Sequence, residues 1–326
     1  MGTGQVCVMI AAYNAEATVA RAVSSALAQG EVAEVILVDD ASTDATAAAA
    51  RAADDGSGRL QIVQMPENGG PAAARNVAIC RSSAAFIAVL DADDFLLPGR
   101  FARLLGMTGC DLAADNIVFV SSAQAASLQP GDVPDFPDGV DMIGAAQFAA
   151  GNLAARGVQR GEMGFLKPLM SRAFLDRHGL RYDAGLWLGE DYDLYMRMLL
   201  KGARFGLTRA VGYGAVVRTG SLSGLHRTGD LEALMQASAR HLKSPGATPV
   251  ARLWIGRHLQ ATRAKFLLRA CLDRKASHGL GGALRFAVSP PSRLLPILRG
   301  VLRDKLQAGR AQPAEAALPR FLIGPN

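Results

Sequence analysis

Short apolar segments alternate with helix-like segments over the first hundred residues of this 326-residue chain. The apolar segments are four runs of strand length: Val6–Ala12, Val35–Val38, Leu60–Gln64 and Phe86–Leu90. Between the first two, Val19, Val23 and Leu27 recur every four residues, which is the spacing of one buried helix face. Continuous apolar runs indicate strands buried on both faces. The alternation therefore predicts an α/β fold with a doubly wound, mostly parallel central sheet.

Polar side chains follow three of these runs at the point where each run ends. Tyr13-Asn14 follows the first, Asp39-Asp40 the second, and Asp91-Ala92-Asp93-Asp94 the fourth. Because ligands bind beyond the carboxyl ends of the strands in such sheets, these segments predict one shared site.

The segment Asp91-Ala92-Asp93-Asp94 is the most informative of the three. Residues i and i+2 of an extended chain point the same way, so Asp91 and Asp93 can face one site, with Asp94 in the turn that follows. Carboxylate oxygens are ligands that Mg²⁺ or Mn²⁺ prefers when the cation also binds phosphate. A capped turn before the helix that Pro98 helps to begin is the alternative, and this segment alone does not separate the two.

Two further segments can contribute to this site. The glycines of Asn68-Gly69-Gly70-Pro71 permit close approach of a ligand, and Arg75 in the next helix suits a phosphate or sugar contact. The segment Gly189-Glu190-Asp191 opens a later helix, where two acids indicate either stabilisation by the helix dipole or a general base. The chain contains neither a GxGxxG fingerprint nor a P-loop.

The remainder of the chain is less regular until its last hundred residues. Residues 128–141 are rich in Pro, Gly and Asp and predict a surface loop, whereas Phe165–Leu200 predicts two helices separated by turns. The Gly- and Arg-rich residues 202–224 predict short irregular segments, and helices are expected from Leu231 onward.

Charge is distributed unevenly along the chain. Residues 1–250 contain 21 Lys and Arg against 26 Asp and Glu, whereas residues 251–326 contain 14 against 3. A basic end indicates an anionic partner surface, either nucleic acid or lipid head groups. An aromatic content of 6% is low for base-stacking platforms, and the acidic first part would repel a phosphate backbone.

Three further features favour a protein that stays in the cytoplasm. The four cysteines form no CxxC pair, the N-terminus lacks the basic region of a signal peptide, and no apolar stretch reaches the ~18 residues of a membrane span. The five histidines show no metal-ligand spacing, so surface or capping roles are expected for them.

The segment from Pro296 onward has an apolar stripe flanked by cations. The stripe contains Ile297, Leu298, Val301, Leu302 and Leu306, and its flanks carry Arg299, Arg303 and Lys305. Such a pattern is typical of an interfacial membrane helix, or of a helix packed on the protein's own core. The basic charge of residues 251–326 favours the membrane, because each cation near anionic lipid contributes ~1 kcal/mol.

Five segments in this order resemble glycosyltransferase family 2, the inverting transferases with a GT-A fold. They are Val8–Glu16 (VMIAAYNAE), Val35–Thr46 (VILVDDASTDAT), Glu67–Asn76 (ENGGPAAARN), Leu90–Phe95 (LDADDF) and Leu188–Tyr195 (LGEDYDLY). The resemblance extends from Val6 to Ser223 and is strongest to bacterial enzymes of exopolysaccharide assembly that build succinoglycan-type units. It implies a GT-A domain over residues 1–225, with a nucleotide-binding half (1–115) and an acceptor half (116–225), before a basic helical region (226–326).

The resemblance also implies roles for individual residues. The nucleotide-sugar site would comprise Ala11, Tyr13, Asn14, Glu16, Asp40, Arg75, Asp91, Ala92 and Asp93, with the Tyr13 ring and the Asp40 carboxylate favouring uracil. Asp93 and Asp94 would bind the metal, Asp191 would deprotonate the acceptor hydroxyl, and Glu190 would hold the acceptor or the loop. Many relatives carry a metal-contacting His where this chain has Arg218, which could instead neutralise the leaving diphosphate.

These features predict an inverting glycosyltransferase that uses Mg²⁺ or Mn²⁺. It would move a sugar from a UDP-sugar to a lipid-diphosphate-linked oligosaccharide in exopolysaccharide biosynthesis, while bound peripherally to the inner face of the cell membrane. One base without a nucleophilic carboxylate implies a single displacement with inversion. The alternatives are a nucleic-acid-binding protein, or a sugar-phosphate nucleotidyltransferase, whose basic pyrophosphate loop is absent from Met9–Glu16.

Overall fold

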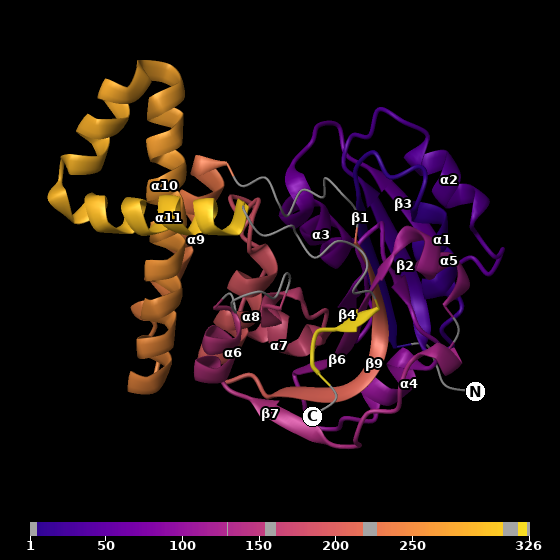
Figure 1. Cartoon of the computed structure of the whole chain (residues 1–326). Coiled ribbons are helices and arrows are strands. Elements are labelled where there is room, and N and C mark those ends of the chain that lie inside the picture. The colour runs from indigo at the N-terminus through magenta and orange to yellow at the C-terminus, as the bar shows by residue number, and fades with distance from the viewer. Residues whose placement is uncertain (1–4, 129, 154–160, 218–226, 309–318, 325–326) are drawn as a thin grey trace.

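The computed structural model describes residues 5–128, 130–153, 161–217, 227–308 and 319–324, without the side chains of Pro130 and of residues 303–308. A central sheet with helices on both faces forms the body, and long C-terminal helices extend to one side of it (Figure 1). Its strands are β1 (Val6–Ala12), β2 (Val32–Asp39), β3 (Leu60–Gln64), β4 (Phe86–Val89), β5 (Phe95–Leu96), β6 (Leu112–Ser121), β7 (Val140–Ile143), β8 (Leu169–Ser171), β9 (Phe205–Val217) and β10 (Arg320–Phe321).

The helices of the body are short and follow the strands in sequence. They are α1 (Val19–Leu27), α2 (Thr46–Ala52), α3 (Gly70–Arg81), α4 (Arg100–Leu105), α5 (Ser122–Ser127), α6 (Ala145–Gly151), α7 (Arg172–Arg177) and α8 (Glu190–Leu200). The C-terminal helices are α9 (Thr228–Leu242), α10 (Pro249–Val288) and α11 (Leu294–Ala308).

The first half of the sheet has the expected parallel arrangement. Strand β1 pairs in parallel with β2 and β4, and β2 pairs in parallel with β3. A hydrophobic core covers each face of the sheet, and alternate residues of β1 contribute to the two cores. Cys7 and Met9 pack with α3 residues, whereas Val8 and Ile10 pack with α1 residues. This two-sided burial explains why the strand is apolar throughout, and the predicted fold class is confirmed.

The second half of the sheet is more extensive than the sequence indicated. The sheet continues from β4 through β8, β6 and β9 to β5, with β8 antiparallel to both of its neighbours. The prediction of irregular segments after Gly202 was wrong, because β9 is a strand of 13 residues. Its glycines mark close contacts: a Cβ atom at Gly212 would lie 1.8 Å from an Asp115 oxygen, and one at Gly214 would lie 2.3 Å from Phe95.

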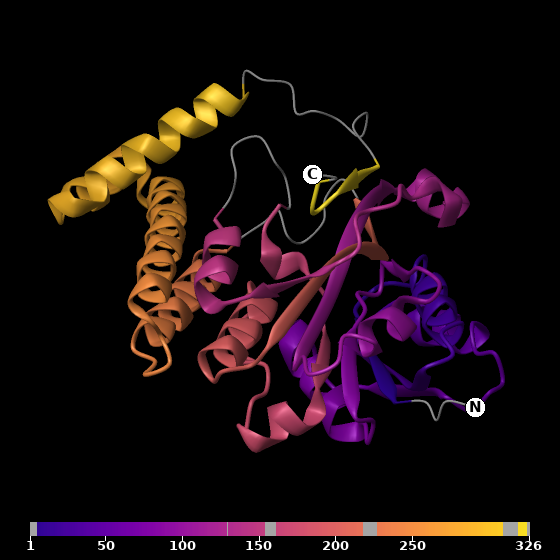
Figure 2. The same ribbon diagram turned by 90° about the horizontal axis from the view of Figure 1, so that it is seen from below.

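The C-terminal helices pack against the body and against each other. The chain reverses within α10 at His278 and Gly279, whose backbone angles are not helical, and α11 packs back on α10 (Figure 2). Among the described residues, no helix combines the length and the apolar character that a bilayer crossing requires. After α11 the chain returns to the body, where β10 pairs with β6 and Phe321 packs against Phe136. Residues 319–324 thus join the sheet rather than the helical region.

Two histidines also differ from expectation, since they are buried between these helices rather than placed at the surface. The His241 ring on α9 lies 2.9 Å from the Asp193 carboxylate on α8, and the His258 ring on α10 lies 3.1 Å from the Ser238 hydroxyl. The exposed fractions of these two histidines are 2% and 8%. Polar contacts of this kind fix α9 and α10 against α8, whose first turn carries candidate site residues.

Candidate active site

The ends of three elements bring oppositely charged side chains together at the carboxyl edge of the sheet. Asp91 follows β4, Arg75 lies in the second turn of α3, and Glu190 and Asp191 open α8. The Arg75 guanidinium donates to Asp91 at 2.9 Å, to Glu190 at 2.7 Å and to Asp191 at 3.1 Å. The structure therefore joins residues that the sequence separates by more than a hundred positions, and all four were expected in the site.

Lys167 completes this network, and the sequence analysis did not single it out. Its ammonium lies 2.9 Å from Asp91 Oδ2 and 2.8 Å from Asp191 Oδ2. The residue precedes β8, which pairs with β4 and so brings Lys167 beside the end of that strand. The available signal was one cation in the otherwise apolar run from Phe165 to Leu169, where a charge needs a buried partner.

The Asp191 carboxylate is held from several sides. Besides Lys167 and Arg75, the hydroxyls of Tyr182 and Tyr195 donate to its Oδ1 atom at 3.1 and 3.3 Å. These contacts fix the orientation of a buried carboxylate at the beginning of a helix, where the helix dipole also stabilises negative charge. Such a group can accept a proton from a substrate hydroxyl.

The charges around Asp91 shift the pKa values of its neighbours in opposite directions. Burial opposes the ionisation of Asp91, but the charges of Lys167 and Arg75 outweigh it and lower its pKa to about 2. Burial, together with the nearby Asp91 charge, raises the pKa of Asp94 to about 7. Burial likewise raises the pKa of Glu190. Unequal pKa values among neighbouring carboxyl groups are typical of catalytic sites.

Asp94 lies in the interior rather than beside Asp93 at the open edge. Its two oxygens accept hydrogen bonds from the Tyr213 hydroxyl and from the Val216 amide, both at 2.8 Å, and the residue is 7% exposed. Asp93 is partly buried, and its backbone carbonyl accepts a hydrogen bond from Arg21. Within the described ranges no group of three His, Cys, Asp or Glu residues is arranged to hold a metal ion.

The residues expected around the nucleotide base lie at the ends of β1 and β2. The Asp40 carboxylate accepts hydrogen bonds from the Gly69 and Gly70 amides, both at 2.8 Å, which ties the glycine-rich turn to β2. The Tyr13 ring is 49% exposed and so is open to stacking. A Trp187 ring, not singled out from the sequence, packs against Gly70 and is 50% exposed.

The other expected site residues shape the surrounding loop. Asn14 accepts a hydrogen bond from the Thr43 amide, and the Glu16 carboxylate accepts one from the Ala45 amide, so both hold the turn after β2. Ala11 and Ala92 lie at the ends of β1 and β4 with little exposure. Arg218 lies outside the described residues.

The sheet order, the helices on both faces and this charged edge together define a GT-A glycosyltransferase. Solved structures share the fold. The structure of S. aureus TarS 1–349 in complex with UDP-GlcNAc has a TM-score of 0.57 at 19% identity, covering 94% of this chain and 88% of that one. The mannosyltransferase PcManGT from Pyrobaculum calidifontis, in complex with GDP-Man and Mn²⁺, has a TM-score of 0.55 at 18% identity, covering 95% and 82%.

Sequence comparison identifies the family. The family model described as "Glycosyl transferase family 2" matches residues 7–123. The succinoglycan biosynthesis protein ExoU of Rhizobium meliloti (strain 1021) is 50% identical over 96% of this chain and 92% of its own length. ExoO of the same strain, also named as a succinoglycan biosynthesis protein, is 31% identical over 97% and 94%. The chain belongs to glycosyltransferase family 2, which confirms the expected enzyme class and sets aside the nucleotidyltransferase and nucleic-acid alternatives.

Proposed function

We propose that this enzyme transfers a sugar from a UDP-sugar to an acceptor hydroxyl with inversion at the anomeric carbon. The observation that carries the proposal is the position of Asp191, whose carboxylate is buried and oriented within the network that also contains Asp91. A carboxylate fixed in this way can take the proton of an incoming hydroxyl. Asp91 then belongs to the donor side of the site and Asp191 to the acceptor side.

The transfer is a single displacement. The acceptor oxygen attacks the anomeric carbon as its proton passes to Asp191, and the bond to the UDP oxygen breaks with its electron pair on the diphosphate. Attack opposite the leaving group inverts the configuration. Arg75, which contacts Asp91 and Asp191 in this structure, is the cation that we assign to stabilising the developing charge of the diphosphate.

Uridine is the proposed base of the donor. Asp40 is 3% exposed and binds the glycine-rich turn through both of its carboxylate oxygens, so we assign it to shaping the base site, while the exposed Tyr13 ring stacks on the base. A structural neighbour that binds UDP-GlcNAc supports this choice.

A divalent cation, Mg²⁺ or Mn²⁺, fits the donor set when Asp93 is its protein ligand. Small hard cations take one or two carboxylates and complete their shell with phosphate oxygens and water. Asp93 is partly exposed at the edge of the sheet whereas Asp94 is 7% exposed and faces the interior, so we assign the metal contact to Asp93 rather than to the pair. When bound, the cation would neutralise charge on the leaving diphosphate.

The proposed acceptor is a lipid-diphosphate-linked oligosaccharide in the assembly of a succinoglycan-type exopolysaccharide. Support comes from two relatives named for succinoglycan biosynthesis, each similar to this chain over nearly its whole length. An acceptor of this type is reached at the inner face of the cell membrane, where we place the enzyme as a peripheral protein.

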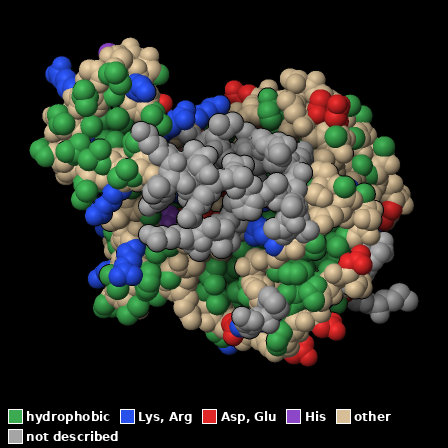
Figure 3. Space-filling model, in the orientation of Figure 1, with side chains coloured by type: hydrophobic (Ala, Val, Ile, Leu, Met, Phe, Trp, Pro, Cys, Tyr) green, Lys and Arg blue, Asp and Glu red, His purple; other side chains and the backbone are tan. Residues whose placement is uncertain are grey.

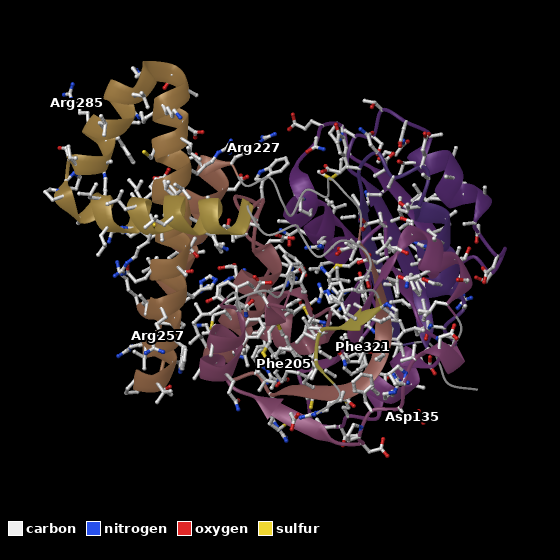
Figure 4. All side chains as sticks on the ribbon, viewed as in Figure 1. Asp135, Phe205, Arg227, Arg257, Arg285 and Phe321 are labelled. Carbon is white, nitrogen blue, oxygen red and sulfur yellow. The ribbon has the colours of Figure 1, made fainter. Side chains whose placement is uncertain are left out.

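The C-terminal helices offer the surface for this membrane contact. The stripe expected on α11 divides in two: Ile297 and Val301 pack against α10, whereas Leu298 and Leu302 are 48% and 59% exposed. Exposed apolar side chains continue from the end of α10 onto α11, at Leu280, Leu284, Val288, Leu294 and Leu295. Figure 3 shows hydrophobic side chains with Lys and Arg among them over these helices, and Figure 4 places Arg285 on the last part of α10. An apolar surface among cations suits an anionic lipid layer.

A panel of UDP-sugars, assayed for hydrolysis and transfer with Mg²⁺ and Mn²⁺, tests the reaction. Asp191→Asn is nearly isosteric but cannot take up the proton, so we expect transfer to fall by ~10²-fold or more while UDP binding is retained. Asp176→Asn, at an exposed carboxylate on α7, is the matched control and should keep full activity. Near-normal transfer by Asp191→Asn would show that Asp191 only stabilises the helix.

A further inference from the structure

Two cations, Arg75 and Lys167, each contact both Asp91 and Asp191. The four side chains therefore form a closed ring in which carboxylates and cations alternate, with all four distances between 2.8 and 3.1 Å. Arg75 also contacts Glu190, whereas among the described residues the ion pairs of Lys167 are those to the two aspartates. The two cations thus differ in their partners, and Lys167 is the one whose ammonium pairs only with the donor-side Asp91 and the acceptor-side Asp191 among the described residues.

We infer that Lys167 is a positioning residue for sugar transfer, which holds the base Asp191 at a fixed distance from Asp91 so that the donor and acceptor sides act as one unit. The inference rests on the proposed function, because it takes Asp191 as the base. It goes beyond that function by giving a role to a residue that none of the sequence motifs contains.

The position of Lys167 is set by the protein core rather than by a substrate. Its carbonyl oxygen accepts a hydrogen bond from Arg100, which is fully buried and pairs with Asp115 through two nitrogens at 2.9 to 3.1 Å. Its neighbours Leu166 and Leu169 are 0% and 3% exposed. A side chain anchored at its own backbone in this way keeps its ammonium in place when a ligand enters the edge of the sheet.

The two cations can then have different roles during donor binding. The Arg75 guanidinium has several donors and can turn toward a diphosphate, because Lys167 continues to neutralise Asp91 and Asp191. Burial disfavours the charge of Lys167, but Asp191 and Asp91 outweigh it and raise its pKa above the ordinary range, so it remains a cation at neutral pH. Lys167 gives up no proton in the reaction, since the acceptor proton goes to Asp191.

Removing this charge has a consequence that a merely structural lysine would not have. The groups that face Asp191 are Arg75 on α3, Lys167 before β8, Tyr182, and Glu190 and Tyr195 on α8. When the Lys167 ammonium is lost, Asp191 Oδ2 loses the contact that links it to Asp91, and the base is no longer held at a fixed distance from the donor side. Transfer should therefore slow while UDP still binds.

The experiment compares Lys167→Met and Lys167→Arg with the matched control Lys201→Met, at an exposed lysine that follows α8. For Lys167→Met we expect kcat for transfer to fall by ~30-fold or more and the Kd for UDP to change by less than about fivefold. Lys167→Arg keeps a cation and should recover ~10-fold of the loss. Lys201→Met should match the wild type in each measurement.

A double variant keeps the test valid if Lys167→Met folds poorly. Lys167→Met combined with Asp191→Asn removes one cation and one carboxylate charge together, so its melting temperature should exceed that of Lys167→Met alone. The inference would be overturned if the losses of stability of the two single variants simply add in the double variant, or if Lys167→Met leaves kcat unchanged. If Asp191→Asn is itself active, it is the base assignment in the proposed function that fails, and the two failures are distinguishable.

Discussion

The sheet edge and the C-terminal helices depart from the usual distribution of side chains in opposite ways. At the edge, charged groups lie inside: Arg75 and Lys167 are 4% and 7% exposed, and both are paired with carboxylates. On the C-terminal helices, large apolar groups lie outside, as Leu280 and Leu284 do at 68% and 64% exposed. Soluble domains seldom bury charge or expose an apolar patch without a functional reason. The difference agrees with the two roles we propose, chemistry at the edge and membrane contact at the helices.

The strongest test of this comparison replaces one buried arginine, which supports Lys167 from the core behind the sheet edge, and one exposed arginine on the C-terminal helices. Arg100→Met leaves Asp115 as an uncompensated buried charge, so we expect it to lower the free energy of unfolding by ~3–5 kcal/mol. Arg285→Met, at an exposed position near the end of α10, should change it by less than ~0.5 kcal/mol. Urea denaturation followed by circular dichroism measures both. Equal effects would mean that the two regions do not differ in how they hold charge.

The second test asks whether α9 is an integral part of the catalytic body or belongs with the exposed C-terminal helices. His241→Ala removes the buried partner of Asp193 and should lower the free energy of unfolding by ~1–3 kcal/mol, whereas His278→Ala, at an exposed position within α10, should have little effect. A large loss for His241→Ala places α9 with the catalytic body. A negligible loss places it with the exposed helices.

The same pair predicts the direction of the pH dependence. Burial opposes the ionisation of Asp193, but the hydrogen bond from His241 and the charge of Arg197 lower its pKa below the ordinary value. A lowered carboxyl pKa contributes stability that is present above the unfolded-state value of ~3.9 and is lost as pH falls through the folded-state value. His241→Ala should therefore show a shallower loss of stability below about pH 4 than the wild type does. An unchanged acid profile would contradict this.

The third test concerns the metal at the sheet edge. Asp93→Asn should weaken UDP binding by ~10-fold in the presence of Mn²⁺ and leave it unchanged when EDTA is present, because one charged ligand of the cation is lost. Asp135→Asn, at an exposed position before β7, is the control. Isothermal titration calorimetry with UDP measures each affinity. A loss that persists in EDTA would indicate a direct contact between Asp93 and the nucleotide.

The smallest expected effect is on the C-terminal helices. Leu298→Ser and Leu302→Ser should each weaken cosedimentation with anionic vesicles by ~5-fold, because less apolar area is buried in the lipid. Val250→Ser, an exposed apolar position at the opposite end of α10, should bind vesicles as the wild type does. If all variants bind the vesicles equally, or if binding does not depend on salt, the proposed membrane contact is wrong.

Point substitutions are preferable here to a truncation after Ser289. Such a truncation would remove β10 together with α11, and with it the contacts of Phe321 with β6 and with Phe136. The Asn116 side chain, which exchanges two hydrogen bonds with the Ile323 backbone, would lose both of these bonds. A truncated enzyme would thus lose part of its sheet as well as the proposed membrane-contact surface.

The sequence alone determined the elements whose signal is local. Val6–Ala12 and Leu60–Gln64 form strands with the predicted bounds, and Glu190 begins the predicted helix, because burial on both faces and helix initiation leave continuous patterns over a few residues. The charged residues at the strand ends were predictable for the same reason, since parallel strands end at one edge.

Only the tertiary structure decided which side chains meet and which way they face. The sequence of β9 looks irregular because its glycines leave room for the side chains of Asp115 and Phe95, which lie far away along the chain. The partners of Lys167, the inward orientation of Asp94 and the division of the α11 stripe likewise depend on elements that come together only on folding. Packing and ion pairing between distant segments leave no periodic pattern in the sequence. This part of the site could therefore be recognised only in the tertiary structure.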